Sequence, residues 1–237
     1  MNPYVKMRVA NRGKGEFKAE ASTIWLYDVI ASDDDEASWW GGISPRQFIQ
    51  ALAETSGPVT LRINSPGGSV FGAQAMVAAM RAHGQPITAR IDSLAASAAS
   101  VIASEASRTE MVPGSMFMIH KAWGLSIGNE DDMRSTADLL AKIDGQIAAA
   151  YARRGSKDPD EWLDMMRAET WFDADEAVAA GLADAVITDN SQRAANLWDL
   201  SAFAAAPKIT PEPAPEPPAP GPTPQQRLKA ELLVKGI

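Results

Sequence analysis

The 237-residue sequence predicts an α/β fold, with a mostly parallel sheet and helices packed on it. Segments with the periodicity of strands and of helices alternate through residues 18–190, as they do in repeated β–α units. Hydrophobic residues make up 46% of the chain, a fraction typical of a folded protein. Prolines become frequent after Ala206, so we expect one folded body followed by an appendage.

The first expected strand, 22–30, ends at the acidic run 33–36, which we interpret as a solvated loop. Ser44 and Pro45 then predict a helix start, because serine caps a helix N-terminus and proline fits the first turn. The further expected elements are strand 59–63, helix 73–82, strand 87–91, helix 95–106, strand 116–120, helices 129–153, 159–167 and 173–180, and strand 185–188. Apolar residues that recur every three or four positions predict the long helix 129–153.

We expect five segments along the chain. They are an N-terminal segment 1–20, a body 21–190, a connector 191–206, a linker 207–224 and a tail 225–237. The linker holds nine of the sixteen prolines, so we expect an extended, polyproline-like spacer there. The short tail has leucines spaced between charged residues, a pattern that fits either a frayed end or a docking peptide for a partner.

Residue counts exclude several classes of chemistry. The absence of cysteine removes disulfides, thiol nucleophiles and cysteine-ligated metals, and two histidines make a histidine-rich metal site improbable. A net charge of −8 argues against non-specific nucleic-acid binding. No apolar run is long enough to span a membrane, and the first residues lack the apolar core of a secretory signal. We therefore expect a cytoplasmic protein with no cofactor, no metal, no nucleic-acid partner and no membrane contact.

A glycine-bearing turn, NSPGGSVFG at residues 64–72, follows a strand and opens a helix. Adjacent glycines at a helix start can present backbone N–H groups to a developing negative charge. An ordinary strand–helix turn would have the same composition, so this motif alone decides nothing. It lacks the spacing of a dinucleotide fingerprint or a P-loop.

A serine and a histidine are the candidate catalytic side chains. Without cysteine, nucleophilic catalysis needs serine or threonine together with a base. His83 precedes Gly84 at an expected helix end, a position that explains this histidine without a catalytic role. His120 ends an apolar strand and is the better-placed base. The alanine- and serine-rich segment 92–106 supplies the competing serines, namely Ser93, Ser97, Ser100 and Ser104.

The order of these motifs resembles the Clp-type serine peptidase family. NSPGG, AAS ending at Ser97, PGSMFMIH ending at His120 and ETWFDADEAVAAGLAD follow one another as the family's motifs do, over about residues 21–188. The resemblance implies a Clp protease/crotonase-like spiral of β-β-α units with a long protruding helix. It also implies a serine-type endopeptidase in which Ser97 is the nucleophile and His120 the general base.

The resemblance assigns the remaining roles as well. The backbone N–H groups of Gly67 or Gly68, with that of Ala98, would form the oxyanion hole, although the family usually has Met-Gly where Ala98 and Ala99 stand. The third triad member is usually an aspartate two residues before an aromatic residue. Counting back two residues from Trp171 of ETWF gives Glu169.

Two alternatives to this triad remain open. Asp173 competes with Glu169, but it begins a D-x-x-E pattern that is typical of a helix N-cap. Lys121 adjoins His120, which leaves a Ser–Lys mechanism possible. Neighbouring residues on a strand point to opposite faces, so only one of these two side chains can face Ser97.

The region that contains WLYDVIASD and ISPRQFIQALAETSGPVTLRINSPGG resembles the Clp-like proteases of phage head-assembly modules. That resemblance implies an ATP-independent prohead maturation protease, a ring homo-oligomer that cleaves scaffold and capsid proteins inside an assembling shell in the host cytoplasm. The alternatives are the proteolytic subunit of a host-type ATP-dependent Clp protease, and a crotonase-fold enzyme or inactive structural homologue.

Overall fold

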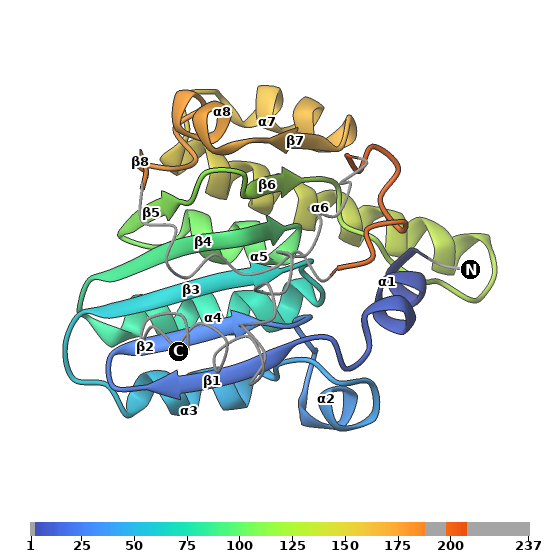
Figure 1. Cartoon of the computed structure of the whole chain (residues 1–237). Coiled ribbons are helices and arrows are strands. Elements are labelled where there is room, and N and C mark those ends of the chain that lie inside the picture. The colour runs from blue at the N-terminus through green and yellow to red at the C-terminus, as the bar shows by residue number, and fades with distance from the viewer. Residues whose placement is uncertain (1–2, 188–197, 208–237) are drawn as a thin grey trace, which may run out of the picture. The chain divides into compact units, whose positions relative to one another are not determined.

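The computed structural model describes residues 3–187 and 198–207 (Figure 1). The helices are α1 (Pro3–Asn11), α2 (Asp34–Trp40), α3 (Pro45–Ala53), α4 (Val70–His83), α5 (Ala98–Ser104), α6 (Glu130–Arg154), α7 (Pro159–Arg167) and α8 (Ala174–Ala179). The strands are β1 (Glu16–Glu20), β2 (Thr23–Tyr27), β3 (Val59–Ser65), β4 (Ile87–Ala96), β5 (Arg108–Met111), β6 (Met116–Ile119), β7 (Thr170–Phe172) and β8 (Ala185–Val186). The predicted α/β class is confirmed.

The eight strands of the described residues form one mixed sheet. β2, β3 and β4 are parallel, and β1 extends this edge as an antiparallel neighbour of β2. β4 is long enough to serve two further strands: residues 88–91 pair with β5, and residues 94–96 pair with β6. β8 pairs with β5, and β7 pairs antiparallel with β6. The carboxyl end of β4 therefore lies between the ends of β3 and β6.

Helices α3, α4 and α5 cover one face of the sheet, and the long helix α6 follows α5 (Figure 1). Successive helices contact one another from α3 to α7, as expected for β–α units wound in one direction. Aliphatic side chains of β2, β3 and β4 are almost completely buried between these layers. The fully buried Tyr151 and Trp162 extend this core to α6 and α7.

The helix caps that the sequence predicts are present in the structure. The Ser44 side chain accepts the Gln47 N–H while the Gln47 side chain accepts the Ser44 N–H, a capping box that starts α3. Asp173 and Glu176 form the same device at α8. α4 ends at His83 with Gly84 in the left-handed conformation, as the sequence predicts.

The acidic run 33–36 is not the loop that we expected. Asp33 caps α2 by accepting the Glu36 N–H, and α2 continues to Trp40. Three acidic residues in its first turn complement the partial positive charge of the helix N-terminus. The acidic run therefore starts a helix, because the N-terminal end of a helix favours negative charge.

The expected helix over 95–106 is wrong at its start. β4 continues through Ala96, because residues 94–96 pair with residues 116–118 of β6, and α5 begins only at Ala98. Strand pairing here overrides the helix propensity of alanine. The short strands β5 and β7, and the helix α1 and strand β1 of the N-terminal segment, were not predicted.

The linker 207–224, apart from Pro207, and the tail 225–237 lie outside the described residues, as does the first part of the connector. The later part of the connector, from Trp198 onward, belongs to the same compact unit as the body. Across residues 3–187 and 198–207, no helix has the length and apolar character needed to cross a membrane.

Candidate active site

Ser97 stands at the turn between β4 and α5. Its backbone has φ 54° and ψ −124°, a conformation that non-glycine residues rarely adopt and that costs on the order of 1–3 kcal/mol. The Ser97 N–H donates to the Met118 carbonyl at 2.9 Å, which ties the turn to β6. Although Ser97 occupies the N-cap position of α5, its hydroxyl makes no capping bond. The hydroxyl is therefore available to another partner.

That partner is His120. The distance between His120 Nε2 and Ser97 Oγ is 2.7 Å, within hydrogen-bond range. Along β6 the side chains alternate as expected: Phe117 and Ile119 enter the main core, while Met118 enters a second apolar cluster with Leu94 and Ala96 of β4. His120 follows on the side of Met118, and this side faces Ser97.

The imidazole of His120 lies in an apolar environment. The ring of Trp123 is 4.5 Å from it and the ring of Phe203 is 5.5 Å from it, between ring centroids, both edge to face. Burial lowers the pKa of His120 from its usual value near 6.5 to about 4. The imidazole is therefore neutral at pH 7, the form that accepts a proton from serine.

The glycine turn lies against the serine. A Cβ added to Gly67 would come within 2.9 Å of the Ala98 nitrogen and 2.8 Å of Ser97 Cβ, so glycine is required for this approach. The Gly67 N–H donates to Ser65 Oγ at 3.1 Å. The N–H groups of Gly68 and Ala98 donate to no other group of the described chain. The pair that stays available to an oxyanion is therefore Gly68 and Ala98.

The structure does not bring Glu169 to His120. The Glu169 carboxylate accepts the backbone N–H groups of Ala204 at 2.8 Å and Ala205 at 2.6 Å, and the indole N–H of Trp171 at 3.2 Å. No described residue accepts a hydrogen bond from His120 Nδ1. Ser97 and His120 thus form a dyad here, and Glu169 as the third member stays a prediction.

Four of the competing residues have other partners. Asp173 caps α8, which agrees with our preference for Glu169. Lys121 forms an ion pair with Asp144 of α6. Ser100 Oγ donates to the Ser97 carbonyl, and Ser104 Oγ to the Ser100 carbonyl, so both hydroxyls serve the backbone of α5.

Sequence reasoning missed two groups that surround the site. Tyr151 of α6 is fully buried, and its hydroxyl lies 2.8 Å from Ser100 Oγ. Phe203 comes from the connector, and Trp198 of the same segment donates its indole N–H to Asn64 Oδ1 at 2.8 Å. Long-range contacts of this kind leave no local pattern in a sequence.

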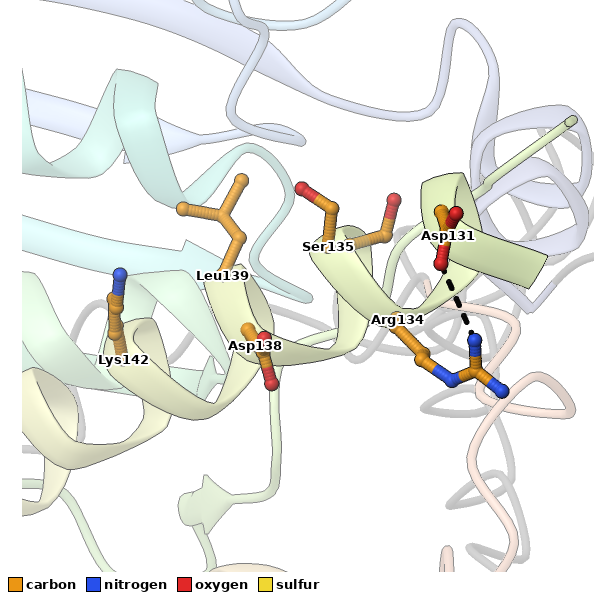
Figure 2. Close-up of a pocket in the computed structure, with 7 residues that line it drawn as sticks. Asp131, Arg134, Ser135, Asp138, Leu139 and Lys142 are labelled. Carbon is orange, nitrogen blue, oxygen red and sulfur yellow. Dashed lines mark hydrogen bonds and ion pairs between the residues drawn. The ribbon is translucent and has the colours of Figure 1, made fainter. Parts of the chain in front are cut away.

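A hollow in the described surface lies elsewhere, along the first half of α6 (Figure 2). Its side chains all come from that helix, and Arg134 and Asp131 form an ion pair at one end. It contains neither member of the dyad. Within the described ranges, no three His, Asp or Glu side chains are grouped so that they could hold a metal ion.

An α/β sheet that presents a serine at a strand–helix turn, with a histidine at hydrogen-bond distance and free backbone donors beside it, defines a serine hydrolase site. Comparison with known proteins identifies the family. Residues 46–190 match the family described as Clp protease, more than half of the chain, and the chain belongs to that family. It is accordingly a serine-type peptidase.

Individual relatives agree with this assignment. A protein of Leuconostoc citreum is 27% identical over 150 residues, which cover 62% of this chain and 74% of the relative. A protein of Pleurastrum terricola is 32% identical over 129 residues, covering 54% and 66% respectively. A protein of Bacteroides thetaiotaomicron is 30% identical over 132 residues, covering 54% and 60%. All three are named ATP-dependent Clp protease proteolytic subunit.

Proposed function

We propose that Ser97 is the nucleophile and His120 the general base of an endopeptidase that works through an acyl-enzyme. The observation that supports this most directly is the 2.7 Å contact between Ser97 Oγ and His120 Nε2. His120 takes the proton of Ser97 as Oγ attacks the scissile carbonyl carbon, and then gives it to the leaving amine. A water molecule then attacks the acyl-enzyme ester while His120 takes its proton. His120 returns this proton to Ser97 Oγ as the acid product leaves.

The oxyanion of the tetrahedral intermediate is held by the N–H groups of Gly68 and Ala98. Gly68 lies in the glycine turn, which packs against Ser97, and Ala98 directly follows Ser97 in the chain. Neither N–H group has another partner among the described residues. Such a donor typically contributes about 2.7–4 kcal/mol to transition-state stabilisation. Ala98 in place of the family's methionine leaves this contribution intact, because the donor belongs to the backbone.

Glu169 is our candidate for the acid that orients His120. The pairs Ile119–Thr170 and Met118–Trp171 of the antiparallel strands β6 and β7 put Glu169 opposite His120, if the register is extended by one residue. Side chains of directly opposed residues lie on the same face of a sheet. We infer that a strand conformation at Glu169, which has φ 54° in this structure, would bring its carboxylate toward Nδ1.

The test of this chemistry is labelling with a fluorophosphonate, which reacts only with an activated serine. We expect one labelled residue, Ser97, found by peptide mass spectrometry. Ser97→Ala should abolish the labelling, whereas Ser93→Ala, a substitution four residues earlier on β4, should retain it. Label that persists in Ser97→Ala would rule out our assignment of the nucleophile.

The relatives' names favour one cellular role: the proteolytic subunit of an ATP-dependent Clp protease. We retain the ATP-independent prohead maturation protease as a second candidate on one observation. Parts of the chain outside the family match pack together, since Asn11 and Asp199 exchange hydrogen bonds, and Phe203 from one of these parts lies against His120. Coexpression with neighbouring capsid and scaffold proteins, without an ATPase, separates the two. Cleavage by the wild type but not by Ser97→Ala supports the maturation protease. If the wild type does not cleave these proteins, the result supports the proteolytic subunit of an ATP-dependent protease.

We also propose that the chain forms a ring homo-oligomer. Apolar side chains stand exposed along α6 and the loop before it: Leu125, Ile127, Met133 and Leu139. Ile127 is 88% exposed, so burial against a second copy would remove unfavourable apolar surface from water. Light scattering that gives a 25.3 kDa species under active conditions would contradict the ring.

A further inference from the structure

The connector returns to the site as a short strap, defined here as residues 198–206. Three of its side chains are buried, Trp198, Leu200 and Phe203. They complete the second apolar cluster by packing on Leu94 and Ala96 of β4 and on Met118 of β6. The strap is the orange-red segment between α1 and the β6–β7 pair (Figure 1).

Phe203 of the strap covers the catalytic imidazole. Its ring centroid lies 5.5 Å from that of His120, 5.2 Å from that of Trp123 and 5.9 Å from that of Trp171. Phe203 is 4% exposed, and His120 is 8% exposed. A peptide whose leaving amine must reach His120 has to approach the same imidazole.

The strap also holds the candidate acid. The N–H groups of Ala204 and Ala205 donate to the two oxygens of the Glu169 carboxylate. Glu169 has φ 54°, so its backbone departs from the strand conformation that would put its side chain beside His120. The same strap thus covers the imidazole and holds the carboxylate that is needed to orient it.

Polar contacts attach the strap to α1. Asn11 of α1 donates to the Asp199 carbonyl at 3.0 Å and accepts the Asp199 N–H at 2.7 Å. Lys6 donates to the Ser201 carbonyl at 2.6 Å. These bonds hold the strap without contacting Ser97 or His120, so they are a place where it can be loosened selectively.

We propose that the apolar surface of Leu94, Ala96, Met118, Trp123 and Trp171 binds aromatic peptide segments, and that the strap is its resident occupant, which keeps the peptidase inactive until displaced. The proposal rests on the proposed function of the dyad. Displacement uncovers His120 and releases Glu169 toward Nδ1, while an aromatic side chain of the substrate takes the place of Phe203. An occupant supplied by the same chain needs no encounter, so a modest intrinsic affinity is enough to exclude substrate.

The test compares the rate of fluorophosphonate labelling in the full-length wild type, Phe203→Ala and Asn11→Ala. We expect both variants to label Ser97 on the order of tenfold faster, which corresponds to about 1.4 kcal/mol of strap binding. Asn11→Ala keeps the test decisive if Phe203→Ala folds poorly, because Asn11 bonds to the backbone of Asp199 and is not part of the apolar surface. Phe17→Ala, on the edge strand β1, is the matched control and should label at the wild-type rate.

A pH profile of labelling distinguishes release of Glu169 from mere uncovering. The charged groups on the segments beside His120 are Glu169, which immediately precedes β7, and the Lys121–Asp144 pair, which joins its loop to α6. The comparison is between Phe203→Ala and the double variant Phe203→Ala with Glu169→Gln, because uncovering alone already raises the pKa of His120 in both. If Glu169 reaches the imidazole, the acid limb should lie at higher pH in Phe203→Ala than in the double variant, because a carboxylate stabilises the imidazolium. Coinciding acid limbs in these two proteins would overturn the acid-release part of the proposal.

The remaining outcomes separate the two proposals. Equal labelling rates in the wild type and in both variants would overturn the strap while leaving Ser97 as nucleophile. Slower labelling in the variants would also overturn it, since the strap would then support the active state. Complete absence of labelling at Ser97 in all of these proteins would refute the proposed function, and with it the strap.

Discussion

Lys121 Nζ lies 3.2 Å from Oδ2 of Asp144 on α6, so the side chain that follows His120 in the sequence is turned away from Ser97. The Ala122 N–H donates to the other oxygen of the same carboxylate at 2.8 Å. The buried Asp144 therefore fixes the segment that leaves β6, and with it the direction in which His120 points. This arrangement favours a Ser–His mechanism over a Ser–Lys mechanism.

The corresponding prediction concerns kcat. His120→Ala should lower kcat for a peptide substrate by roughly 10⁴–10⁶-fold, because Ser97 loses its proton acceptor. Lys121→Ala should stay within about threefold of the wild type in kcat, since Lys121 pairs with Asp144 and contacts neither Ser97 nor His120. Circular dichroism checks that both variants fold. A large loss of kcat in Lys121→Ala alone would exchange the roles of the two residues.

A second prediction concerns the glycine turn. Gly67→Ala should lower the free energy of unfolding by about 2–4 kcal/mol and abolish labelling of Ser97. Its Cβ would stand 2.5 Å from the Ala96 carbonyl oxygen, at a φ of 89° that disfavours alanine. Urea denaturation and fluorophosphonate labelling measure the two effects.

Gly84→Ala is the matched control for this substitution. Gly84 has a similar positive φ, 71°, but a Cβ there meets no atom within 4 Å. It should cost only about 1 kcal/mol and leave labelling unchanged. Equal costs at the two glycines would show that backbone strain, and not the approach of Gly67 to Ser97, explains the turn.

The local parts of the fold and site were predictable from the sequence, and the long-range parts were not. Capping residues such as Ser44 and Asp173 act on the N–H groups three positions later, so their pattern is visible in the sequence. Ser97 and His120 were found because their motifs follow one another in a recognisable order. The position of the strap could not be predicted from the sequence, because Phe203 and His120 lie far apart in it and meet only when the chain folds.

A third prediction concerns stability against pH. The folded pKa of His120 is about 4, below its unfolded value near 6.5, so the unfolded chain binds the additional proton between these values. The contribution of the neutral imidazole is fully present above pH 6.5 and is lost as the pH falls toward 4. The loss amounts to roughly 3 kcal/mol.

The measurement is urea unfolding of the wild type and His120→Gln from pH 4 to pH 8. Subtracting the two profiles cancels most of the contribution of the carboxylates and of His83, which both proteins retain. The difference should favour the wild type increasingly as the pH rises from 4 to 6.5 and should be constant above it. A difference independent of pH would contradict the burial of a neutral His120.

The final prediction concerns the network behind the nucleophile. Ser100 Oγ uses its single proton toward the Ser97 carbonyl, so Tyr151 must donate its own proton to Ser100 Oγ. Tyr151→Phe should lower the free energy of unfolding by about 1 kcal/mol, the usual net contribution of one hydrogen bond. Ser100→Ala should cost more, about 1–3 kcal/mol, because it leaves the buried hydroxyl of Tyr151 without an acceptor and frees the Ser97 carbonyl.

The double variant, which carries Ser100→Ala and Tyr151→Phe in one chain, tests whether the two hydroxyls bond to each other. Because the substituted phenylalanine has no hydroxyl left to satisfy, the double variant should cost less than the sum of the two single substitutions. Slower labelling of Ser97 in Ser100→Ala than in Tyr151→Phe would further indicate that the bond to the Ser97 carbonyl maintains the strained turn. If Tyr151→Phe proves the more costly single substitution, Ser100 must donate to Tyr151, and the Ser97 carbonyl is held by the backbone of α5 alone.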